Sequence, residues 1–306
     1  MKKQVFNLFA LAALLFMPFT FAACGGSDDE EEVVPPTDPV AGLPLLLQAE
    51  DGLYHNNVLL FRITDAEKHE VEVVNPVNFG TCRNAEIPEA VNINEERYAV
   101  TTIADNAFSI FDNETGKYVE NNVLETIIIP HSINKIGQFV CSMCYNLKDV
   151  FIPKEVEQIG WCFLFDCPAL EEIIVQEGNA KFDSRQNCNA LIKTINNCLL
   201  KGCKNTVIPN GIKIIDVCAF ENIPELTEID IPASVTSIEQ RAFADCTNLM
   251  KITSRNTTPP TLDKLVFHRI PQNCMLYVPD RCVDKYLSQW PFKSGYVKAF
   301  GISVDR

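Results

Sequence analysis

Cysteines are the residues of this chain that are best placed to bind a metal. Cys141 and Cys144 form a Cys-x-x-Cys pair, and Cys162 and Cys167 follow further along the chain. Four thiolates in two such pairs have the spacing of a structural zinc site. The same residues are also candidates for disulfide bonds or for buried packing, and the choice depends on where they fall in the fold.

Motifs for catalysis are missing from the sequence. It has no Gly-x-Ser-x-Gly, no His-Glu-x-x-His and no glycine-rich phosphate loop. Its four histidines are His55, His69, His131 and His268, and the pair His69-Glu70 lies in a strand-like run that favours a solvated edge. The many carboxylates leave a chance acid pair open. We expect a protein that is not an enzyme and that holds no metal and no cofactor.

Composition indicates a folded, acidic protein. The 306 residues are 47% hydrophobic and include 40 acidic and 26 basic side chains, for a formal net charge of −14. This length allows one or two domains. Nucleic-acid binding needs clustered Lys and Arg, so the acidic balance argues against a nucleic-acid partner.

The N-terminus predicts export. Lys2 and Lys3 precede an apolar run from Leu8 to Met17, and small residues lead to Cys24. This is the layout of a secretory signal, and ten apolar residues are too few to span a bilayer. Ala22-Ala23-Cys24 resembles a lipobox, so residues 1–23 are predicted to be a lipoprotein signal peptide, with Cys24 as the lipidated residue. The alternative is a plain signal peptide with an incidental cysteine.

Residues 24–44 predict an extended tether. The segment 25–32 reads Gly-Gly-Ser-Asp-Asp-Glu-Glu-Glu, and four prolines follow by residue 44. Like charges repel one another and proline disfavours regular structure, so this segment should stay extended. The acidic cluster after Cys24 also resembles the surface-export signal of Bacteroidetes lipoproteins, which implies an outer-membrane lipoprotein exposed at the cell surface. A solvated spacer is the alternative.

The body of the chain is a repeat. Apolar residues recur at offsets +4, +5, +8, +11, +14 and +16 from a central isoleucine, in about six units between residues 99 and 257. The central isoleucines are Ile103, which starts a longer first copy, and then Ile136, Ile159, Ile215 and Ile238. The repeat period is 23 residues, as from Ile136 to Ile159. A single unit of this length cannot bury its apolar row alone, so the units stack into a solenoid with a continuous core.

Each unit ends in a predicted short strand. In Leu-x-x-Ile-x-Ile-Pro the residues at +14 and +16 alternate and so face the same side, inward. The proline that follows has no N–H and ends the ladder. Stacked units would therefore form a parallel sheet, with the Ala-Phe-x-x-Cys segment on another side.

The motif Ile-Gly-x-x-Ala-Phe-x-x-Cys-x-x-Leu-x-x-Ile-x-Ile-Pro resembles the BspA-like leucine-rich-repeat family of surface proteins. The resemblance implies a right-handed leucine-rich-repeat solenoid of short parallel β-strands, with turns or short helices on the convex side. Residues 45–98, rich in alternating strands, would form a β-hairpin N-terminal cap. Residues 258–306 would form a C-terminal cap, a strand at 275–279 and an α-helix N-capped by Asp280.

The repeat also suggests a role for the cysteines. Cys144, Cys167 and Cys246 share offset +8, and Cys162 and Cys218 share offset +3. A position locked to the repeat favours a buried, stacked side chain, as free cysteine often is. Disulfides and zinc remain alternatives, although a bridge between stacked Cβ atoms about 4.8 Å apart would be strained.

The outward strand positions, +13 and +15, predict a contact surface. Four consecutive +15 residues are apolar, and the +13 residues are mostly acidic or polar. The candidate binding residues are Ile128, Asp149, Phe151, Glu172, Ile174, Asn205, Val207, Glu228 and Asp230. An apolar stripe with charged edges is typical of a contact surface, although β-propensity alone also places branched residues in strands.

Two functions remain. The first is a surface-anchored, adhesin-like binding protein, since members of the resembled family bind extracellular-matrix and plasma proteins. The second is an accessory envelope lipoprotein for glycan or nutrient capture or for complex assembly. A glycan site favours exposed aromatic rings, and the predicted stripe offers only Phe151. We therefore expect a monomer that binds a protein ligand, such as a host extracellular or plasma protein, and contacts the membrane through its lipid alone.

Overall fold

The computed structural model describes residues 38–300 of the chain. Its compact unit begins at Pro39, before the predicted end of the tether at residue 44. The reason is local pairing: the Asn92 N–H donates to the Pro44 carbonyl at 2.9 Å, and the Leu46 N–H donates to the Asn92 carbonyl at 2.8 Å. The predicted signal peptide and Cys24 lie outside the described residues.

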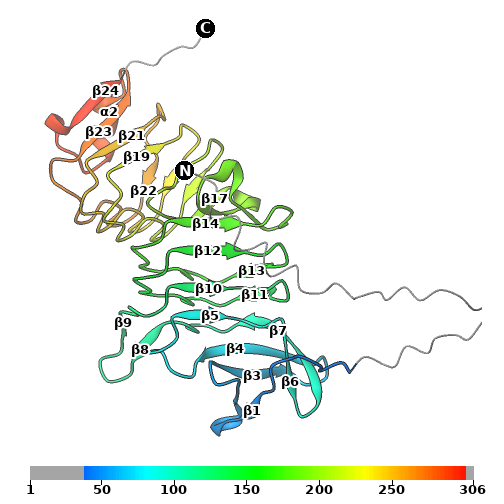
Figure 1. The fold of residues 1–306 in the computed structure, drawn as a ribbon. Coiled ribbons are helices and arrows are strands. Elements are labelled where there is room, and N and C mark those ends of the chain that lie inside the picture. The colour runs from blue at the N-terminus through cyan, green and yellow to red at the C-terminus, as the bar shows by residue number, and fades with distance from the viewer. Residues whose placement is uncertain (1–37, 301–306) are drawn as a thin grey trace, which may run out of the picture. The chain divides into compact units, whose positions relative to one another are not determined.

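Short parallel strands stack along the unit in two rows (Figure 1). We call the first the front row. It consists of two four-stranded sheets, one formed by β5 (Asn84–Glu86), β10 (Thr126–Ile128), β12 (Asp149–Ile152) and β14 (Glu172–Val175), the other by β19 (Glu228–Ile231), β21 (Lys251–Ser254), β23 (Met275–Pro279) and β24 (Val297–Phe300).

The second row, the side row, runs through the central residues of the repeats. Its strands are β7 (Glu96–Ile103), β11 (Lys135–Ile136) and β13 (Gln158–Ile159), and then β17 (Cys198–Gly202), β18 (Ile214–Ile215), β20 (Ser237–Ile238) and β22 (Thr261–Leu262). The central isoleucines pair in register, Ile103 with Ile136 and Ile136 with Ile159. The repeat period read from the sequence is therefore also the structural period.

Between the two rows each repeat forms a turn-rich segment that we call the arch. The complete arches that follow the first repeat are residues 137–144, 160–167, 216–223, 239–246 and 263–270. At three of their junctions, the N–H groups at offsets +3, +5 and +7 donate to carbonyls of the next arch. One such junction joins Phe139 to Trp161 (3.1 Å), Cys141 to Phe163 (2.8 Å) and Met143 to Phe165 (2.8 Å).

The inward side chains behave as predicted. Val150 and Ile152 on β12 and Ile229 and Ile231 on β19 are buried, whereas residues between them face outward. Phe243 is also buried, and its ring stacks on that of the adjacent copy's phenylalanine at 5.0 Å. The first repeat is longer because the hairpin β8 (Ile110–Asp112) and β9 (Lys117–Val119) is inserted in its arch.

One repeat has no arch. In complete repeats 16 residues separate the central residue from the last inward strand residue, as from Ile159 to Val175, but only nine separate Leu199 from Ile208. Leu199 is the structural equivalent of a central isoleucine, because it pairs with Ile215. We call residues 198–209 the archless repeat.

The archless repeat begins with a hairpin that separates two cores. β15 (Phe182–Asp183), β16 (Ala190–Lys193) and β17 are antiparallel neighbours. Leu191 packs in the core of the preceding repeats, and Ile192 packs in the core of the following ones. Because successive strand residues point to opposite faces, β16 has one face in each core. Short 3₁₀ turns, η2 (Arg185–Asn187) and η3 (Thr194–Asn196), flank it.

The N-terminal strands lie beside the first repeat. β3 (Leu59–Asp65) and β4 (Glu70–Pro76) form an antiparallel hairpin, and β4 runs parallel to β7. Smaller elements complete this end of the unit: β1 (Leu47–Gln48), η1 (Glu50–Gly52), β2 (Tyr54–His55) and β6 (Ala90–Ile93).

At the C-terminal end, the repeat geometry continues past residue 257, where the repeats were predicted to end. β22 pairs with β20, and β23 pairs with β21, so residues 261–279 form a further repeat. The sequence already carried its offsets in Leu262, Val266 and Phe267. The next elements are α2 (Val283–Gln289), η4 (Ser294–Tyr296) and β24.

The predicted N-cap of the C-terminal helix is wrong. The cap residue of α2 is Cys282, without a side-chain cap hydrogen bond, so Asp280 lies outside the helix. The predicted apolar face is correct, since Tyr286 and Trp290 are buried. None of the helices within residues 38–300 has the length and apolar character to span a bilayer.

Candidate functional site

Three of the predicted apolar contact residues form a continuous patch on the front row. Phe151 and Ile174 are register partners on β12 and β14, and Ile128 lies on the neighbouring β10. Ile128 is 46% exposed and Ile174 37% exposed, while Phe151 is half-buried. We call these three residues the front patch.

Two acidic side chains lie side by side along the front patch. Asp149 and Glu172 are register partners across β12 and β14. Partial burial raises the pKa of Asp149, with a further rise from Glu171, and burial followed by repulsion from Asp149 raises the pKa of Glu172. Like charges placed opposite each other destabilise a sheet. This acidic pair is therefore a place where a positive group of a ligand would relieve repulsion.

Asn205 and Val207 do not continue this surface, contrary to the prediction. They belong to the archless repeat, where residues 203–208 form no strand. The Val207 N–H donates to the Cys188 carbonyl at 3.1 Å, and the Asn205 side chain donates to the Glu171 carbonyl at 3.2 Å. The front-row sheet ends at β14, so Val207, although 72% exposed, is not in the column of Ile174.

Glu228 and Asp230 lie on the second front-row sheet, and both carry ion pairs. Lys251 Nζ lies 3.0 Å from Glu228 Oε2, and Arg255 Nε lies 2.8 Å from Asp230 Oδ1. Their charges are balanced by the neighbouring strand and its end, unlike those of the acidic pair. The predicted site residues therefore divide into an assembled group on β10, β12 and β14 and two groups apart from it.

The repeat-locked cysteines Cys144, Cys167, Cys218 and Cys246 are buried thiols, whereas Cys162 is half-buried. At offset +8, Cys167 Sγ lies 3.0 Å from the Cys141 carbonyl and Cys246 Sγ lies 3.0 Å from the Phe220 carbonyl, each in the preceding arch. Burial raises the pKa of Cys246 to about 11. The twelve cysteines in the described part of the chain are free, and no group of side chains there has a metal-binding arrangement. These thiols pack and donate weak hydrogen bonds.

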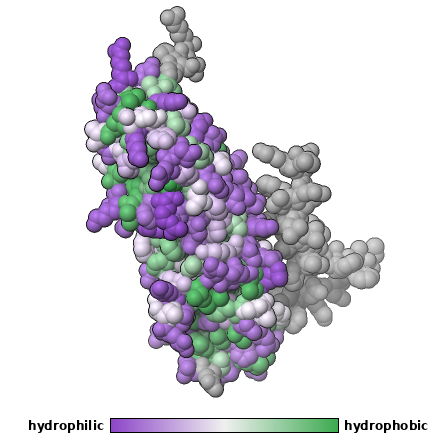
Figure 2. All heavy atoms as spheres, turned by 90° about the vertical axis from the view of Figure 1, so that its left-hand side faces the viewer, coloured by the Kyte–Doolittle hydropathy of each residue, from purple (hydrophilic) through white to green (hydrophobic). Residues whose placement is uncertain are grey.

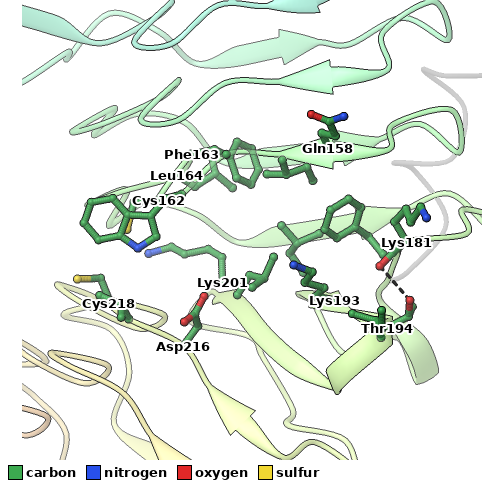
Figure 3. A pocket seen from close by; sticks show the side chains of 18 of the residues that line it. Gln158, Cys162, Phe163, Leu164, Lys181, Lys193, Thr194, Lys201, Asp216 and Cys218 are labelled. Atoms are coloured by element: carbon green, nitrogen blue, oxygen red, sulfur yellow. Dashed lines mark hydrogen bonds between the residues drawn. The ribbon is translucent and has the colours of Figure 1, made fainter. Parts of the chain in front are cut away.

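The archless repeat leaves a cavity that the sequence reading missed. Its volume is about 940 Å³, and it lies between the arches 160–167 and 216–223. In Figure 3 the Lys201 side chain runs between the arch carrying Cys162 and the arch carrying Cys218. The signal was present in the sequence as the shortened distance from Leu199 to Ile208.

A row of aromatic rings on the arch side was missed as well. Phe111, Tyr118, Phe139 and Trp161 follow one another with ring centroids 5.0–5.5 Å apart. Phe111 is 48% exposed and Trp161 53% exposed, and Trp161 also lines the cavity. Figure 2 faces the side from which the β8–β9 hairpin projects in Figure 1, and apolar areas interrupt the polar surface there.

Solved structures with low similarity to this chain include several bacterial repeat proteins. The pneumococcal vaccine antigen PcpA is 15% identical, with 84% of this chain and 99% of that chain covered and a TM-score of 0.36. A leucine-rich cell surface protein from Faecalibacterium prausnitzii is 16% identical, with 81% and 95% covered and a TM-score of 0.34. A leucine-rich repeat protein from Bacteroides ovatus is 18% identical, with 80% and 89% covered and a TM-score of 0.26.

A search of the curated proteins found no match. The family model described as the BspA type leucine rich repeat region matches six copies, over residues 69–193 and 185–270. These matches span more than half of the chain and include both front-row sheets up to β21. The chain belongs to the BspA-type leucine-rich-repeat family.

Proposed function

We propose that this protein is a non-enzymatic, cell-surface protein-binding module that uses the front patch and its acidic pair as the contact surface. The observation that carries the proposal is the acidic pair, Asp149 and Glu172, held side by side against exposed apolar residues. Repulsion between these carboxylates is a cost to the fold, and groups with perturbed pKa values cluster at functional sites. Family membership supports a role in protein interaction.

The partner we propose is a protein that presents a basic side chain next to an apolar one. A Lys or Arg would lie against Asp149 and Glu172, and an apolar anchor would cover Phe151 and its neighbours. Aromatic and apolar residues dominate binding hot spots, and charge complementarity sets specificity and association rate. In an adhesin-like role the partner would be a host extracellular or plasma protein, and the module would bind it as a monomer.

Anchoring through Cys24 is part of the proposal. A lipid on Cys24 and the acidic, proline-rich segment after it would hold the module at the outer membrane, facing outward. Cys24→Ser should move the protein from the membrane fraction to the soluble fraction. Retention of that variant in the membrane would remove the lipoprotein from the proposal and leave the binding surface untouched.

We further propose that the ends of the right-handed solenoid are capped. The β3–β4 hairpin would cover the first repeat, and α2 with β24 would cover the last one. Terminal caps keep the apolar ends of repeat arrays from water. Buried Phe61 at one end and Tyr286 at the other support this role.

The test of the contact surface is capture from host plasma by the immobilised protein. Phe151→Ala combined with Ile174→Ser should weaken capture at least tenfold, about 1.4 kcal/mol, with little change in melting temperature. The matched control is Leu47→Ala combined with Val58→Ser, which removes similar exposed apolar surface elsewhere. Equal capture by both double variants would reject the front patch as the binding surface.

Glycan capture is a second candidate, favoured by the aromatic row on the arch side. Exposed rings of this kind stack on the apolar faces of sugars, and the front row has no equivalent. Trp161→Ala should abolish glycan-array binding if this function holds. If the wild-type protein gives no signal on the array, glycan capture is rejected and protein binding is the remaining candidate function.

A further inference from the structure

The cavity at the archless repeat is a gap in an otherwise regular hydrogen-bond ladder. In the arches 137–144, 216–223 and 239–246, the N–H groups at +3, +5 and +7 donate to the next arch. The equivalent groups of the arch 160–167 belong to Cys162, Leu164 and Asp166. Within residues 38–300 none of these three N–H groups has a hydrogen-bond acceptor. Backbone donors that face an absent neighbour are an open edge.

The opposite wall of the cavity, formed by the arch 216–223, has backbone acceptors rather than donors that are unpaired in the described part of the chain. In complete junctions the carbonyls at +2, +4 and +6 accept from the preceding arch. In the arch 216–223 the Ala219 carbonyl accepts from the Gly202 N–H at 2.9 Å, while the Val217 and Glu221 carbonyls have no donor within the described residues. One wall thus offers donors and the other acceptors, at the same offsets that donate and accept in the complete junctions.

A buried charge lies between these walls. Lys201 is only 5% exposed, lines the cavity, and its Nζ has no hydrogen-bond partner among residues 38–300. An isolated ammonium taken out of water is costly unless it is paired. Asp166 does not supply the partner: its Oδ1 accepts from the Asn222 side chain, and no ion pair joins Lys201 to it or to Asp216, which lines the same cavity.

The rest of the lining favours an anionic, partly apolar guest. Lys181 and Lys193 add two further positive charges at exposed positions, against the carboxylates of Glu157 and Asp216. Trp161, which is 53% exposed, lines the same cavity and so lies at its mouth. In a chain with a net charge of −14, a pocket with three lysines is a local exception.

We propose that this cavity binds an extended peptide segment of a partner protein and that an acidic side chain of the peptide pairs with Lys201. The peptide main chain takes the place of the missing arch. Its carbonyls accept from the Cys162 and Leu164 N–H groups, and its N–H groups donate to the Val217 carbonyl. This is strand addition at an open edge, with a charged pocket for specificity. The site is separate from the front patch and does not depend on the proposed function there.

The experiment selects peptides from a random heptapeptide display library on the full-length protein. Recovered peptides should be enriched in Asp or Glu at one position relative to the unselected library. Lys201→Met keeps the length of the side chain without its charge and should weaken binding of a selected peptide at least tenfold. Lys213→Met, at an exposed lysine outside the cavity lining, is the matched control and should change binding less than threefold.

Residue-resolved hydrogen exchange tests the main-chain part of the proposal. Bound peptide should slow exchange of the Cys162 and Leu164 amides at least tenfold. The Cys141 amide, already bonded to Phe163, should not change. The front-patch variant Phe151→Ala with Ile174→Ser should bind the peptide normally. The proposal for the cavity and the proposal for the front patch can therefore fail independently of each other.

Several results would overturn the proposal. Selected peptides without acidic enrichment, equal binding by Lys201→Met, or unchanged exchange at Cys162 and Leu164 each reject it. Failure to select any peptide rejects it too. If hyaluronan oligosaccharides bind in a Lys201-dependent manner while peptides do not, the cavity is a site for acidic glycans instead.

Discussion

At the residue scale, the arches depend on close backbone contacts and on unusual dihedral angles. A Cβ at Gly160 would lie 2.3 Å from the Gln138 backbone nitrogen, and one at Gly137 would lie 2.5 Å from that of Asp105. Non-glycine residues at +3 and +7 adopt positive φ in successive arches, for example Phe139 at 52° and Met143 at 55°. Stacked neighbours hold these residues in a conformation that isolated side chains disfavour.

Gly160→Ala should therefore destabilise the protein. The clash is with backbone, which cannot swing aside, so the arches must shift apart at a cost of about 1–3 kcal/mol. Gly295→Ala is the control, because nothing lies within 4 Å of a Cβ there. Urea unfolding of both variants checks the prediction, and equal midpoints would mean that the arches are not tightly stacked.

Phe243→Ala should be more costly. Its ring stacks at 5.0 Å on Phe220 and at 5.7 Å on Phe267, and its side chain is fully buried. Truncating a buried phenylalanine costs about 3–5 kcal/mol. Phe111→Ala, at a half-exposed site, should cost less than about 1 kcal/mol by the same denaturation measurement. A loss below that value at Phe243 would contradict the stacked arrangement.

At the element scale, the sequence predicted what repeats and missed what interrupts the repeat. Inward and outward strand positions follow from period-two alternation, and β12, β14 and β19 obey it. The side row was not predicted, because most of its strands have only two residues and carry no alternation to detect. The position of Val207 was wrong because the alignment assumed a complete repeat there. Trp161 and Lys201 were missed because the predicted contact surface used only the outward strand positions +13 and +15. Trp161 lies in an arch, and Lys201 lies on β17 beside the gap.

The acidic pair on β12 and β14 predicts a pH effect. A carboxyl whose pKa is raised in the folded state binds more protons there than in the unfolded state, so stability falls as pH rises through the window from about 4 to the raised value. Asp149→Asn with Glu172→Gln removes this penalty. The variant should melt about 2 °C higher than wild type at pH 7, and the difference should shrink below pH 4.

Glu228→Gln with Asp230→Asn is the matched control for the acidic pair. Here the carboxylates are paired with Lys251 and Arg255, so neutralising them should leave the melting temperature at pH 7 unchanged or lower it. A rise in both double variants would indicate a general relief of net negative charge rather than a local one.

At the scale of the whole molecule, the β16–β17 hairpin divides the apolar interior into two cores. Adjacent residues of one strand serve different cores, Leu191 the first and Ile192 the second. Family membership was predictable from the repeats alone, since stacking makes each unit obey the same spacing. The division into two cores was not predictable, because the position of the hairpin decides which apolar residues pack in which core.

Leu191→Ala and Ile192→Ala should therefore destabilise different halves. Each truncation leaves a cavity costing about 2–5 kcal/mol. Native-state hydrogen exchange should accelerate mainly within residues 126–175 for Leu191→Ala, and mainly within residues 212–252 for Ile192→Ala. Uniform acceleration in either variant would mean that the two cores unfold as one cooperative unit.

The interrupted ladder has a mechanical consequence. Within residues 38–300 no sheet joins β13 or β14 to the strands of the second half. Tension applied along the stack, as on a tethered molecule in flowing liquid, is shared by strand ladders everywhere except here. At the gap it is borne by side-chain packing, by side-chain hydrogen bonds such as those from Asn222 to Asp166 and from Asn205 to the Glu171 carbonyl, and by the covalent chain of the hairpin. Extension should begin at this point, while the repeats on either side keep their folded structure.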